Sequence, residues 1–347
     1  MRKKIATFLL FLFMFQVGVS SYGQAAEPPY FAAISDVHEG MVAVWDEFHW
    51  GFMDVTGKIV IKLQYEDVWF FREGLAPVKK NGKWGFIDKK GKLVIKNQYD
   101  RAFPFSEGIA IVIKDGKITY INKKGKEIVR TSYTDSYIDF HEGLVGVQKN
   151  GKWGFIDKTG KEVIKPQFDK VLNFYEGLAA IQKNRKWGFI NKKGQIVIVP
   201  QYDQAYEFSE GLAPVNVKGK WGFIDKKGKL VIKPKFDGVH NGEDSFSPGF
   251  HEGLAAVLVN NKWGFINQKG EFQIKPKYTE MNASFHEGVA IVRTEEYLPA
   301  YIDKTGKILL EGDESETFGT FDNGVAVIRS TGNYSFFKNS LKKGKKN

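Results

Sequence analysis

One phrase recurs through nearly the whole chain and constrains what the chain can fold into. Residues 81–92 read NGKWGFIDKKGK, and varied copies return about every 34 residues. Self-similarity at such a period indicates a repeat architecture in which each unit packs on its neighbours. Three degenerate copies keep the period without Trp, at residues 118–120, 299–301 and 334–336. The other six carry a Trp-Gly pair, interpreted as a structural motif: Trp50-Gly51, Trp84-Gly85, Trp153-Gly154, Trp187-Gly188, Trp221-Gly222 and Trp263-Gly264.

Each unit alternates β-like runs with turns. Asn81-Gly82 separates two such runs, and this pair tolerates the positive φ angles that a tight hairpin requires. The second turn runs from Asp88 to Gly91, and Asp or Asn with Gly three residues later recurs in eight copies. This spacing fits a type I turn followed by a left-handed Gly. We therefore interpret the recurring Asp as structural, neither catalytic nor metal-binding.

The units predict an all-β fold, a tandem repeat array of three-stranded antiparallel meanders. The array covers residues 37–338, with eight full units and a final half unit. An aromatic residue occupies the place after the Gly in all nine copies, as expected of a core residue. We favour an open or superhelical array, because the two ends do not complete one unit and the unit lengths differ. A closed, propeller-like ring is the alternative.

The flanks indicate export. Residues 1–25 resemble a signal peptide, with a basic start, an apolar run over 5–19 and small residues at Gly23 and Ala25. The apolar run is shorter than the about 20 residues that span a bilayer, so we expect no transmembrane segment in the mature chain. An uncleaved anchor is the alternative. Residues 26–36 are predicted to lead into the array, and residues 339–347 form a basic tail.

Composition excludes several classes of site. The chain has no Cys, so disulfides, thiol chemistry and Cys-ligated zinc are impossible. The formal net charge is +11, but the Lys residues are spread over predicted turns and the tail. This pattern is typical of a solvated surface rather than of a nucleic-acid groove, so we expect no nucleic-acid partner. For the tail, a contact with anionic polymers and a solvated end both stay open.

The recurring phrase Lys-Trp-Gly-Phe-Ile-Asp-Lys-x-Gly-Lys, with Phe-x-Glu-Gly before it, resembles the WG (KWG) repeat family of bacterial proteins. The resemblance covers about residues 37–338. It implies short β repeats, often on exported or envelope-associated proteins. It implies no established catalytic activity and no family site to carry over.

The search for chemistry finds little. His38, His141, His251 and His286 directly precede Glu-Gly, and a His-Glu pair can bind metal or serve acid-base catalysis. One His per unit cannot converge unless the array folds back, so we interpret them as structural. The Glu of Glu-Gly recurs in eight of nine copies, as expected of a half-buried Glu that receives backbone N–H groups. No catalytic residue, cofactor site or metal site is predicted.

These observations predict an exported, monomeric, non-enzymatic scaffold that is secreted or attached to the cell envelope. Its partner would be a protein or an envelope polymer. The candidate interaction surface comprises Trp45 and Trp69, outside the repeat phrase, and His240 and Asp244 in an insertion at residues 237–249. The polar positions before Glu-Gly, which vary between units, and the basic tail are further places where a partner could bind.

Two alternatives remain. A carbohydrate- or wall-binding module would expose the repeated Trp84, Trp153, Trp187 and Trp221 in a row, although core packing is favoured for them. A secreted hydrolase would use a propeller-like bowl, where carboxylates from several units converge. A scaffold would instead spread its carboxylates along turns.

Overall fold

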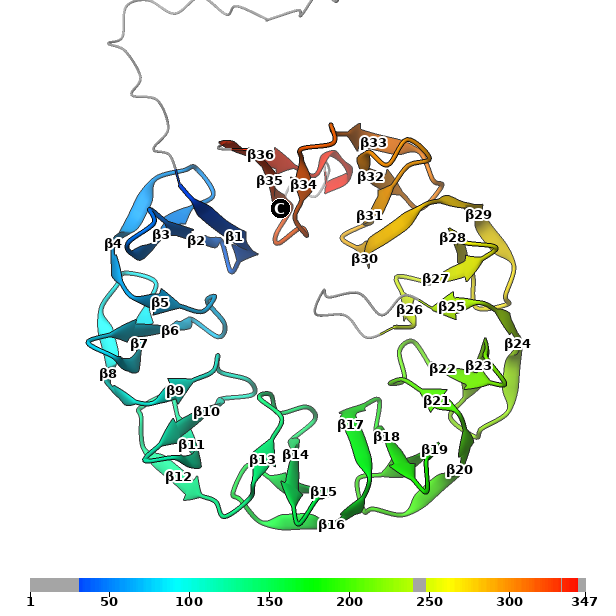
Figure 1. Ribbon diagram of the computed structural model, residues 1–347, viewed down its shortest axis with the longest axis horizontal. Coiled ribbons are helices and arrows are strands. Elements are labelled where there is room, and N and C mark those ends of the chain that lie inside the picture. Colours follow the sequence, from blue (N-terminus) through cyan, green and yellow to red (C-terminus); the bar gives the residue numbers. More distant parts are fainter. Residues whose placement is uncertain (1–30, 240–247, 332, 343–347) are drawn as a thin grey trace, which may run out of the picture. The chain divides into compact units, whose positions relative to one another are not determined.

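The computed structural model describes residues 31–239, 248–331 and 333–342. Predictions for the signal peptide at 1–25, for His240 and Asp244, and for the tail beyond residue 342 lie outside the described residues. Within them, the chain forms nine small antiparallel sheets arranged around a ring (Figure 1). No helix of the described part is long and apolar enough to cross a membrane. We number the sheets 1 to 9 in chain order.

The strands follow one another outward in each sheet. Sheet 1 contains β1 (Ala33–His38), β2 (Met41–Trp45), β3 (Trp50–Asp54) and β4 (Ile59–Tyr65). Sheet 2 contains β5 (Asp67–Val68), β6 (Leu75–Lys80), β7 (Lys83–Asp88) and β8 (Leu93–Tyr99). Sheet 3 contains β9 (Arg101–Ala102), β10 (Ile109–Lys114), β11 (Lys117–Asn122) and β12 (Glu127–Arg130). Sheet 4 contains β13 (Asp135–Ser136), β14 (Leu144–Lys149), β15 (Lys152–Asp157) and β16 (Glu162–Phe168). Sheet 5 contains β17 (Lys170–Tyr175), β18 (Leu178–Lys183), β19 (Lys186–Asn191) and β20 (Ile196–Tyr202).

The same order continues through the second half. Sheet 6 contains β21 (Gln204–Ala205), β22 (Leu212–Val217), β23 (Lys220–Asp225) and β24 (Leu230–Phe236). Sheet 7 contains β25 (Gly238–Val239), β26 (Phe250–His251), β27 (Leu254–Val259), β28 (Lys262–Ile266) and β29 (Phe272–Tyr278). Sheet 8 contains β30 (Glu280–His286), β31 (Val289–Arg293), β32 (Pro299–Asp303) and β33 (Ile308–Glu311). Sheet 9 contains β34 (Thr317–Phe318), β35 (Val325–Ser330) and β36 (Asn333–Lys338), followed by the 3-10 helix η1 (Ser340–Lys342).

The all-β array of antiparallel meanders is confirmed, with one addition. A short inner strand, such as β5, precedes the three predicted strands of each unit and pairs with the first of them. In six sheets this strand has only two residues, too few to give a period in the sequence. In sheet 1 it is β1, so the array begins inside the segment 26–36 that we expected to precede it. Among the described residues, sheet 9 has three strands and no outer one.

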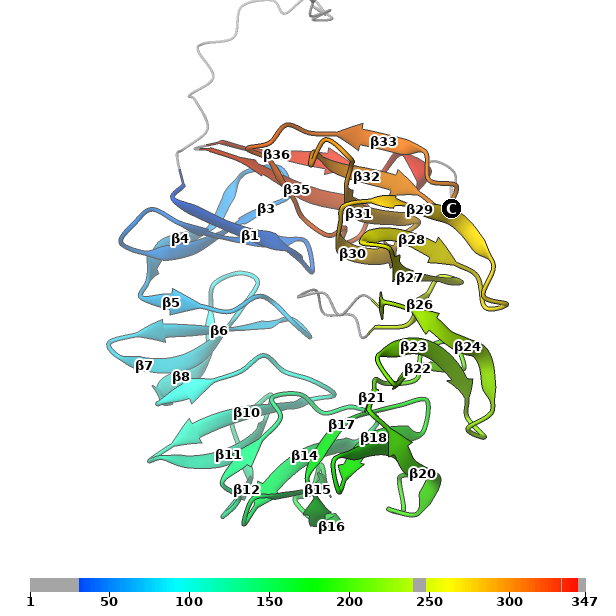
Figure 2. The same cartoon turned by 45° about the vertical axis from the view of Figure 1, so that its right-hand side comes forward.

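The array closes into a ring, which is the alternative that the sequence left open, rather than the open form we favoured. Strand β1 lies beside β35 in both views (Figure 1 and Figure 2). Arg329 donates from Nε to the carbonyl oxygen of Ile34 at 2.8 Å and pairs with Asp36. Val37 and Val327 belong to one buried cluster across the same seam. Closure therefore uses contacts between two separate sheets, so the chain ends need not complete one sheet together.

Aromatic pairs join each sheet to the next. The aromatic residue of the Trp-Gly strand packs against the Phe that precedes x-Glu-Gly in the following sheet. Eight such pairs have ring centroids 4.8 to 5.7 Å apart, for example Phe86 with Phe105. Eight of the nine aromatics are buried and Phe336 is partly buried. The prediction that they form the core is confirmed for those eight.

The position after Trp requires Gly because the backbone of the neighbouring strand lies too close for a side chain. A Cβ on Gly85 would lie 2.5 Å from the carbonyl oxygen of Ile95 in β8. In this sheet the pairing shifts between Trp84↔Tyr99 and Phe86↔Ile95, and β8 has seven residues. Sheet 3 has Thr119 at the Gly position, no shift at that point, and only four residues in β12. The Gly thus permits a bulge, and the bulge brings the aromatic residue at the end of the outer strand, Tyr99 in sheet 2, opposite the Trp.

Candidate functional site

A cavity of about 980 Å³ lies at the centre of the ring, and we call it the central cavity. Its lining comes from all nine sheets, which identifies it as the hole of the ring. Most lining residues lie between the inner strand and the Glu-Gly turn of their sheet, or in the turn itself. The site must therefore be built from that turn.

The Glu-Gly turn is a connector between sheets. Glu73 and Gly74 have φ angles of 54° and 83°, so two left-handed residues reverse the chain. The N–H of Gly74 donates to Oε2 of Glu39 in sheet 1 at 3.0 Å. Lys89 Nζ lies 3.1 Å from the same oxygen. Burial disfavours ionisation of Glu39, but these hydrogen bonds outweigh it and hold its pKa below the ordinary value.

This connection recurs around the ring. Each Glu accepts the N–H of the Gly one sheet further on, and the eight Glu are Glu39, Glu73, Glu107, Glu142, Glu176, Glu210, Glu252 and Glu287. At the seam, the N–H of Gly40 donates to Asp322 Oδ2 at 3.2 Å. The recurring Glu thus receives a backbone N–H group, as predicted. It is partly buried in five of the eight copies, whereas Glu107, Glu210 and Glu252 are exposed. The sequence did not predict that the donor is the Gly of the next sheet.

The residues on either side of the recurring Phe vary between sheets and line the central cavity. After the Phe, Arg72, His141, Tyr175 and Asp322 reach it. Before the Phe, the lining residues are Phe70, Pro104, Asp139, Asn173, Glu207 and Thr320. The constant residues therefore hold the ring together, and the variable residues determine the chemistry of its centre.

The lining mixes polar and apolar residues, and two groups of neighbouring residues differ in chemistry. Asp139, Asn173 and Glu207 hold the position before the Phe in three consecutive sheets, 4 to 6, and we call them the polar arc. Trp69, Phe70 and Pro104 come from sheets 2 and 3 and form an apolar arc. Glu207 is only 9% exposed. The cavity can thus contact both a polar group and an apolar one.

Arg72 crosses toward the polar arc. Its Nη1 lies 2.8 Å from Asp139 Oδ2, and its Nη2 donates to Ser106 Oγ at 3.2 Å. Ser106 in turn donates to the carbonyl oxygen of Phe140 at 2.9 Å. The other oxygen of Asp139 and Oδ1 of Asn173 are buried, and neither has a hydrogen-bond partner among the described residues.

The ring brings together His residues that an open array would separate. His38, His141 and His286 all line the central cavity, contrary to the expectation that they stay apart. Burial lowers the pKa of His38 and of His141, so both are neutral near pH 7. His38 stacks on Phe70 with centroids 4.3 Å apart, and His141 packs on Tyr175 at 4.8 Å. Within the described ranges, no three His, Asp or Glu side chains are grouped so that they could hold a metal ion.

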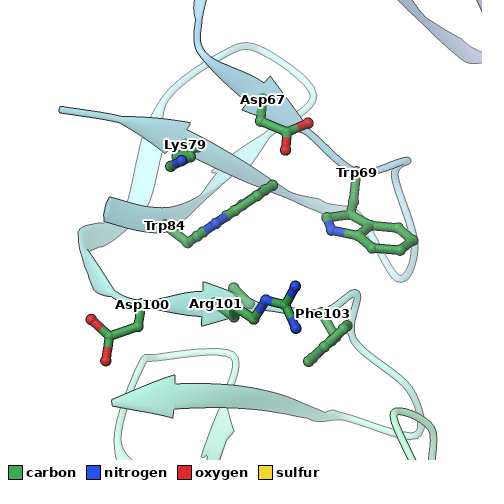
Figure 3. Close-up of a pocket in the computed structure, with 8 residues that line it drawn as sticks. Asp67, Trp69, Lys79, Trp84, Asp100, Arg101 and Phe103 are labelled. Carbon is green, nitrogen blue, oxygen red and sulfur yellow. The ribbon is translucent and has the colours of Figure 1, made fainter. Parts of the chain in front are cut away.

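A smaller cavity of about 330 Å³ lies between sheets 2 and 3 (Figure 3). Trp69, Trp84, Arg101 and Phe103 line it. The Arg101 guanidinium lies beneath the Trp84 indole, between Asp100 and Phe103 (Figure 3). Trp69 lines both cavities and is 37% exposed. Among the four residues of the predicted interaction surface, it is the one that the described structure places at a cavity.

The other predicted residues lie elsewhere. Trp45 is partly buried and stacks on Trp50 with centroids 6.0 Å apart. His240 and Asp244 lie outside the described residues, so their prediction is not tested. Sequence analysis missed the polar arc. Aligning the units on the recurring Phe would have shown that the residue before it changes from Phe70 and Pro104 to Asp139, Asn173 and Glu207.

The repeated Trp residues do not form an exposed ladder. Trp84, Trp187 and Trp221 are 7%, 9% and 7% exposed, so they belong to the core. Trp153 is partly buried and stacks on Tyr137 at 4.9 Å. A sugar platform built from these side chains is therefore excluded, and the preference for core packing is confirmed for the three buried rings.

Comparison with known proteins agrees with the repeat. The family model described as "WG containing repeat" matches residues 50–84, 84–117, 118–153, 153–187, 187–221, 221–263, 263–297 and 300–334. A search of curated protein sequences gave no match.

Several solved structures are similar at low sequence identity. A crystal structure described as the eukaryotic initiation factor is 12% identical with a TM-score of 0.53, covering 82% of this chain and 90% of that one. The computationally designed Ika8 protein is 14% identical with a TM-score of 0.48, over 78% and 95% of the two chains. BamB from Moraxella catarrhalis is 11% identical with a TM-score of 0.47, over 81% and 92%. The first of these supports a shared fold and nothing further.

Proposed function

Because the chain belongs to the WG repeat family, we propose that it is an exported, non-enzymatic interaction scaffold whose binding face is the central cavity. One observation carries the proposal. The residues that repeat in every unit connect the sheets, whereas most residues that line the central cavity vary between units. A ring of nearly equal units then supplies a rigid frame for a centre in which every unit contributes a different side chain.

The partner is a protein or an envelope polymer rather than a nucleic acid. Export is inferred from the signal-like residues 1–25, and such a protein meets wall polymers and other exported proteins. Trp69 is the aromatic anchor that we expect to matter most, because it is partly exposed and borders both cavities. The scaffold acts as a monomer, since one ring already encloses the whole site.

Two matched Trp variants test the proposal. Retention of the purified full chain would be measured on isolated bacterial cell walls, on anionic wall polymers and on candidate exported proteins. Trp69→Ala should weaken retention on the true partner by about tenfold or more, the effect typical of a buried aromatic anchor. Trp45→Ala removes a similar ring outside the central cavity and should leave retention unchanged. Equal retention of both variants and the native chain would refute a binding face at the cavity.

A hydrolase is the second candidate, and one observation favours it. Carboxylates of Asp139, Glu207 and Asp322 from three sheets line the same cavity, which is the convergence expected of an enzyme. We rank it lower because Asp139 pairs with Arg72, and Asp322 accepts hydrogen bonds from the N–H of Gly40 and the amide of Asn323. Hydrolysis of wall glycans or peptides by the native chain, lost in both Asp139→Asn and Glu207→Gln, would establish the enzyme instead.

A further inference from the structure

We propose that the central cavity binds a cationic group on an apolar stem, an ammonium or a guanidinium. The group would come from a Lys or Arg side chain of a partner polypeptide, or from a free polyamine. This inference rests on the proposed function, because it names the ligand chemistry of the same cavity. Three properties of the lining support it: its charge, its unpaired acceptors and its apolar arc.

The lining is acidic although the chain is basic. Glu39, Asp139, Glu207 and Asp322 line the central cavity, and Arg72 is its one Lys or Arg among the described residues. Glu39 pairs with Lys89 and Asp139 with Arg72, so the negative charge of the lining comes mainly from Glu207 and Asp322. The whole chain carries a formal charge of +11. A concave site with carboxylates and low-dielectric walls concentrates a negative potential, which attracts cations. His38 and His141 do not reverse this sign, since partial burial lowers the pKa of each and keeps both neutral near pH 7.

The unpaired groups beneath the lining are acceptors. Asp139 Oδ1 and Asn173 Oδ1 are buried without a hydrogen-bond partner in the described structure. No side-chain nitrogen of the described lining is left buried and unpaired in the same way. Buried acceptors are costly to leave unpaired, so rotation of these two side chains toward a ligand that brings N–H donors is favoured over rotation toward one that brings acceptors.

An anionic ligand fits less well, because the one Lys or Arg of the described lining is already paired with a carboxylate. The Arg72 guanidinium already donates through both Nη atoms, to Asp139 and to Ser106. A neutral sugar could donate hydroxyl groups to the polar arc but would gain nothing from the net charge. A cation gains from both the acceptors and the charge, and charge-assisted hydrogen bonds are about twice as strong as neutral ones.

The apolar arc suits the stem of such a ligand. Trp69, Phe70 and Pro104 lie in sheets 2 and 3, and two further apolar residues, Ile138 and Leu172, line the cavity beside the polar arc. A Lys or Arg side chain buries its methylene groups on apolar surface while its head reaches polar groups. Tyr175 and Tyr206 also line the cavity, and aromatic rings of this kind attract cations.

Calorimetric titration of the full chain tests the inference. The probes are spermidine, a short Lys- and Arg-containing peptide, a poly-Glu peptide of equal length, and a neutral oligosaccharide. Saturable binding of the peptide or of spermidine is expected, weakened by added salt, with no binding of the poly-Glu peptide. Tighter binding of the peptide would identify a polypeptide source, and tighter binding of spermidine a free polyamine. Binding of the poly-Glu peptide or the oligosaccharide alone would overturn the inference.

A matched pair of variants tests whether the cation binds at the polar arc. Glu207→Gln removes one charge from the polar arc and should weaken cation binding by about tenfold or more. Asp203→Asn removes the same charge from the same sheet, but Asp203 pairs with Lys186 at 2.6 Å outside the cavity and should have little effect. Thermal unfolding of each variant verifies that the ring is intact. Equal affinity of Glu207→Gln and the native chain would refute the cation site.

The two proposals fail in different ways. If Trp69→Ala abolishes retention of a partner while Glu207→Gln leaves it unchanged, the cavity binds a partner but does not require a cation there. If neither variant changes retention or titration, the central cavity is not the binding face, and both proposals fall.

Discussion

Replacing Gly85 with Ala tests the reason for the Trp-Gly pair most directly. The added Cβ would lie 2.5 Å from the carbonyl oxygen of Ile95 and 2.7 Å from the backbone nitrogen of Asn97. Ordinary contact begins near 3.4 Å, so β8 would have to move by about 0.9 Å. Both obstructing atoms are backbone atoms, so no side-chain rotation relieves the clash. The bulge that places Tyr99 opposite Trp84 would be strained or lost.

The expected cost follows from this geometry. Overpacking a well-packed interior costs about 1–3 kcal/mol, and a backbone obstruction belongs at the upper end. We therefore expect Gly85→Ala to lower the free energy of unfolding by about 3 kcal/mol. For a chain of this size that is a fall in the thermal midpoint of about 5 °C. Hydrogen exchange in residues 93–99 should accelerate as well, since β8 is the strand displaced.

Sheet 8 supplies the control. It has Ala300 at the Gly85 position, a four-residue outer strand and no shift in pairing between Ala300 and Tyr301. Ala300→Gly relieves no clash and should cost only about 0.5–1 kcal/mol, from the greater flexibility of Gly. A thermal midpoint for Gly85→Ala no lower than that of Ala300→Gly would refute the explanation, because it would mean that the bulge does not depend on the Gly.

Two further predictions concern the connections between sheets. The pKa values of four carboxyl groups are lowered in the folded chain, those of Glu39, Glu107, Asp100 and Asp203. In their ionised form these groups stabilise the fold. That stabilisation is present above the ordinary pKa values of 4.5 for Glu and 3.8 for Asp, and it is lost as pH falls through and below those values. The thermal midpoint should therefore drop steeply on acidification through pH 4.5, and Glu39→Gln should flatten that drop; a midpoint unchanged down to the lowered pKa values would contradict it. Arg329→Leu removes the partner of Asp36 and of the Ile34 carbonyl at the seam, where both side chains are mostly buried, and should cost about 1–3 kcal/mol in a urea titration. The exposed pair of Lys152 and Asp169 provides the comparison, since Lys152→Met should cost at most about 1 kcal/mol, and an equal cost for both variants would argue against a special seam.

Much of the fold could be predicted because the period exposes it. Asn81-Gly82 and Asp88 to Gly91 carry local turn chemistry, and the structure has those turns, with Asp88 Oδ1 accepting from the N–H groups of Lys90 and Lys92 at 2.9 Å. The aromatic positions follow from their recurrence. Ring closure could not be predicted in the same way, because it depends on the small rotation between successive sheets. No single residue encodes that rotation.

The candidate site was only partly accessible to sequence reasoning for the same reason. The varied positions before Glu-Gly were identified, but an open array would have dispersed them along one edge. Only closure places Arg72, His141 and Tyr175 around one cavity. Asp139 and Glu207 were missed because the inner strands of sheets 4 and 6 have only two residues and leave no pattern. Asn173 was missed because no strand was predicted over Lys170–Tyr175, so the common position of the three residues was not apparent.

The seam between sheets 9 and 1 has a consequence for how many units such a ring can contain. Arg329 and Asp36 are 293 residues apart in the chain, whereas Glu39 and Gly74, in neighbouring sheets, are 35 apart. The entropy of closing a flexible loop grows only with the logarithm of its length, so the long closure costs about 2 kcal/mol more than the short one. The stabilisation expected from the seam contacts is comparable to this entropic cost. The Arg329→Leu variant measures how much of that stabilisation one residue provides. Chain entropy therefore sets no sharp upper limit on the number of units, and the rotation from each sheet to the next decides where the ring closes.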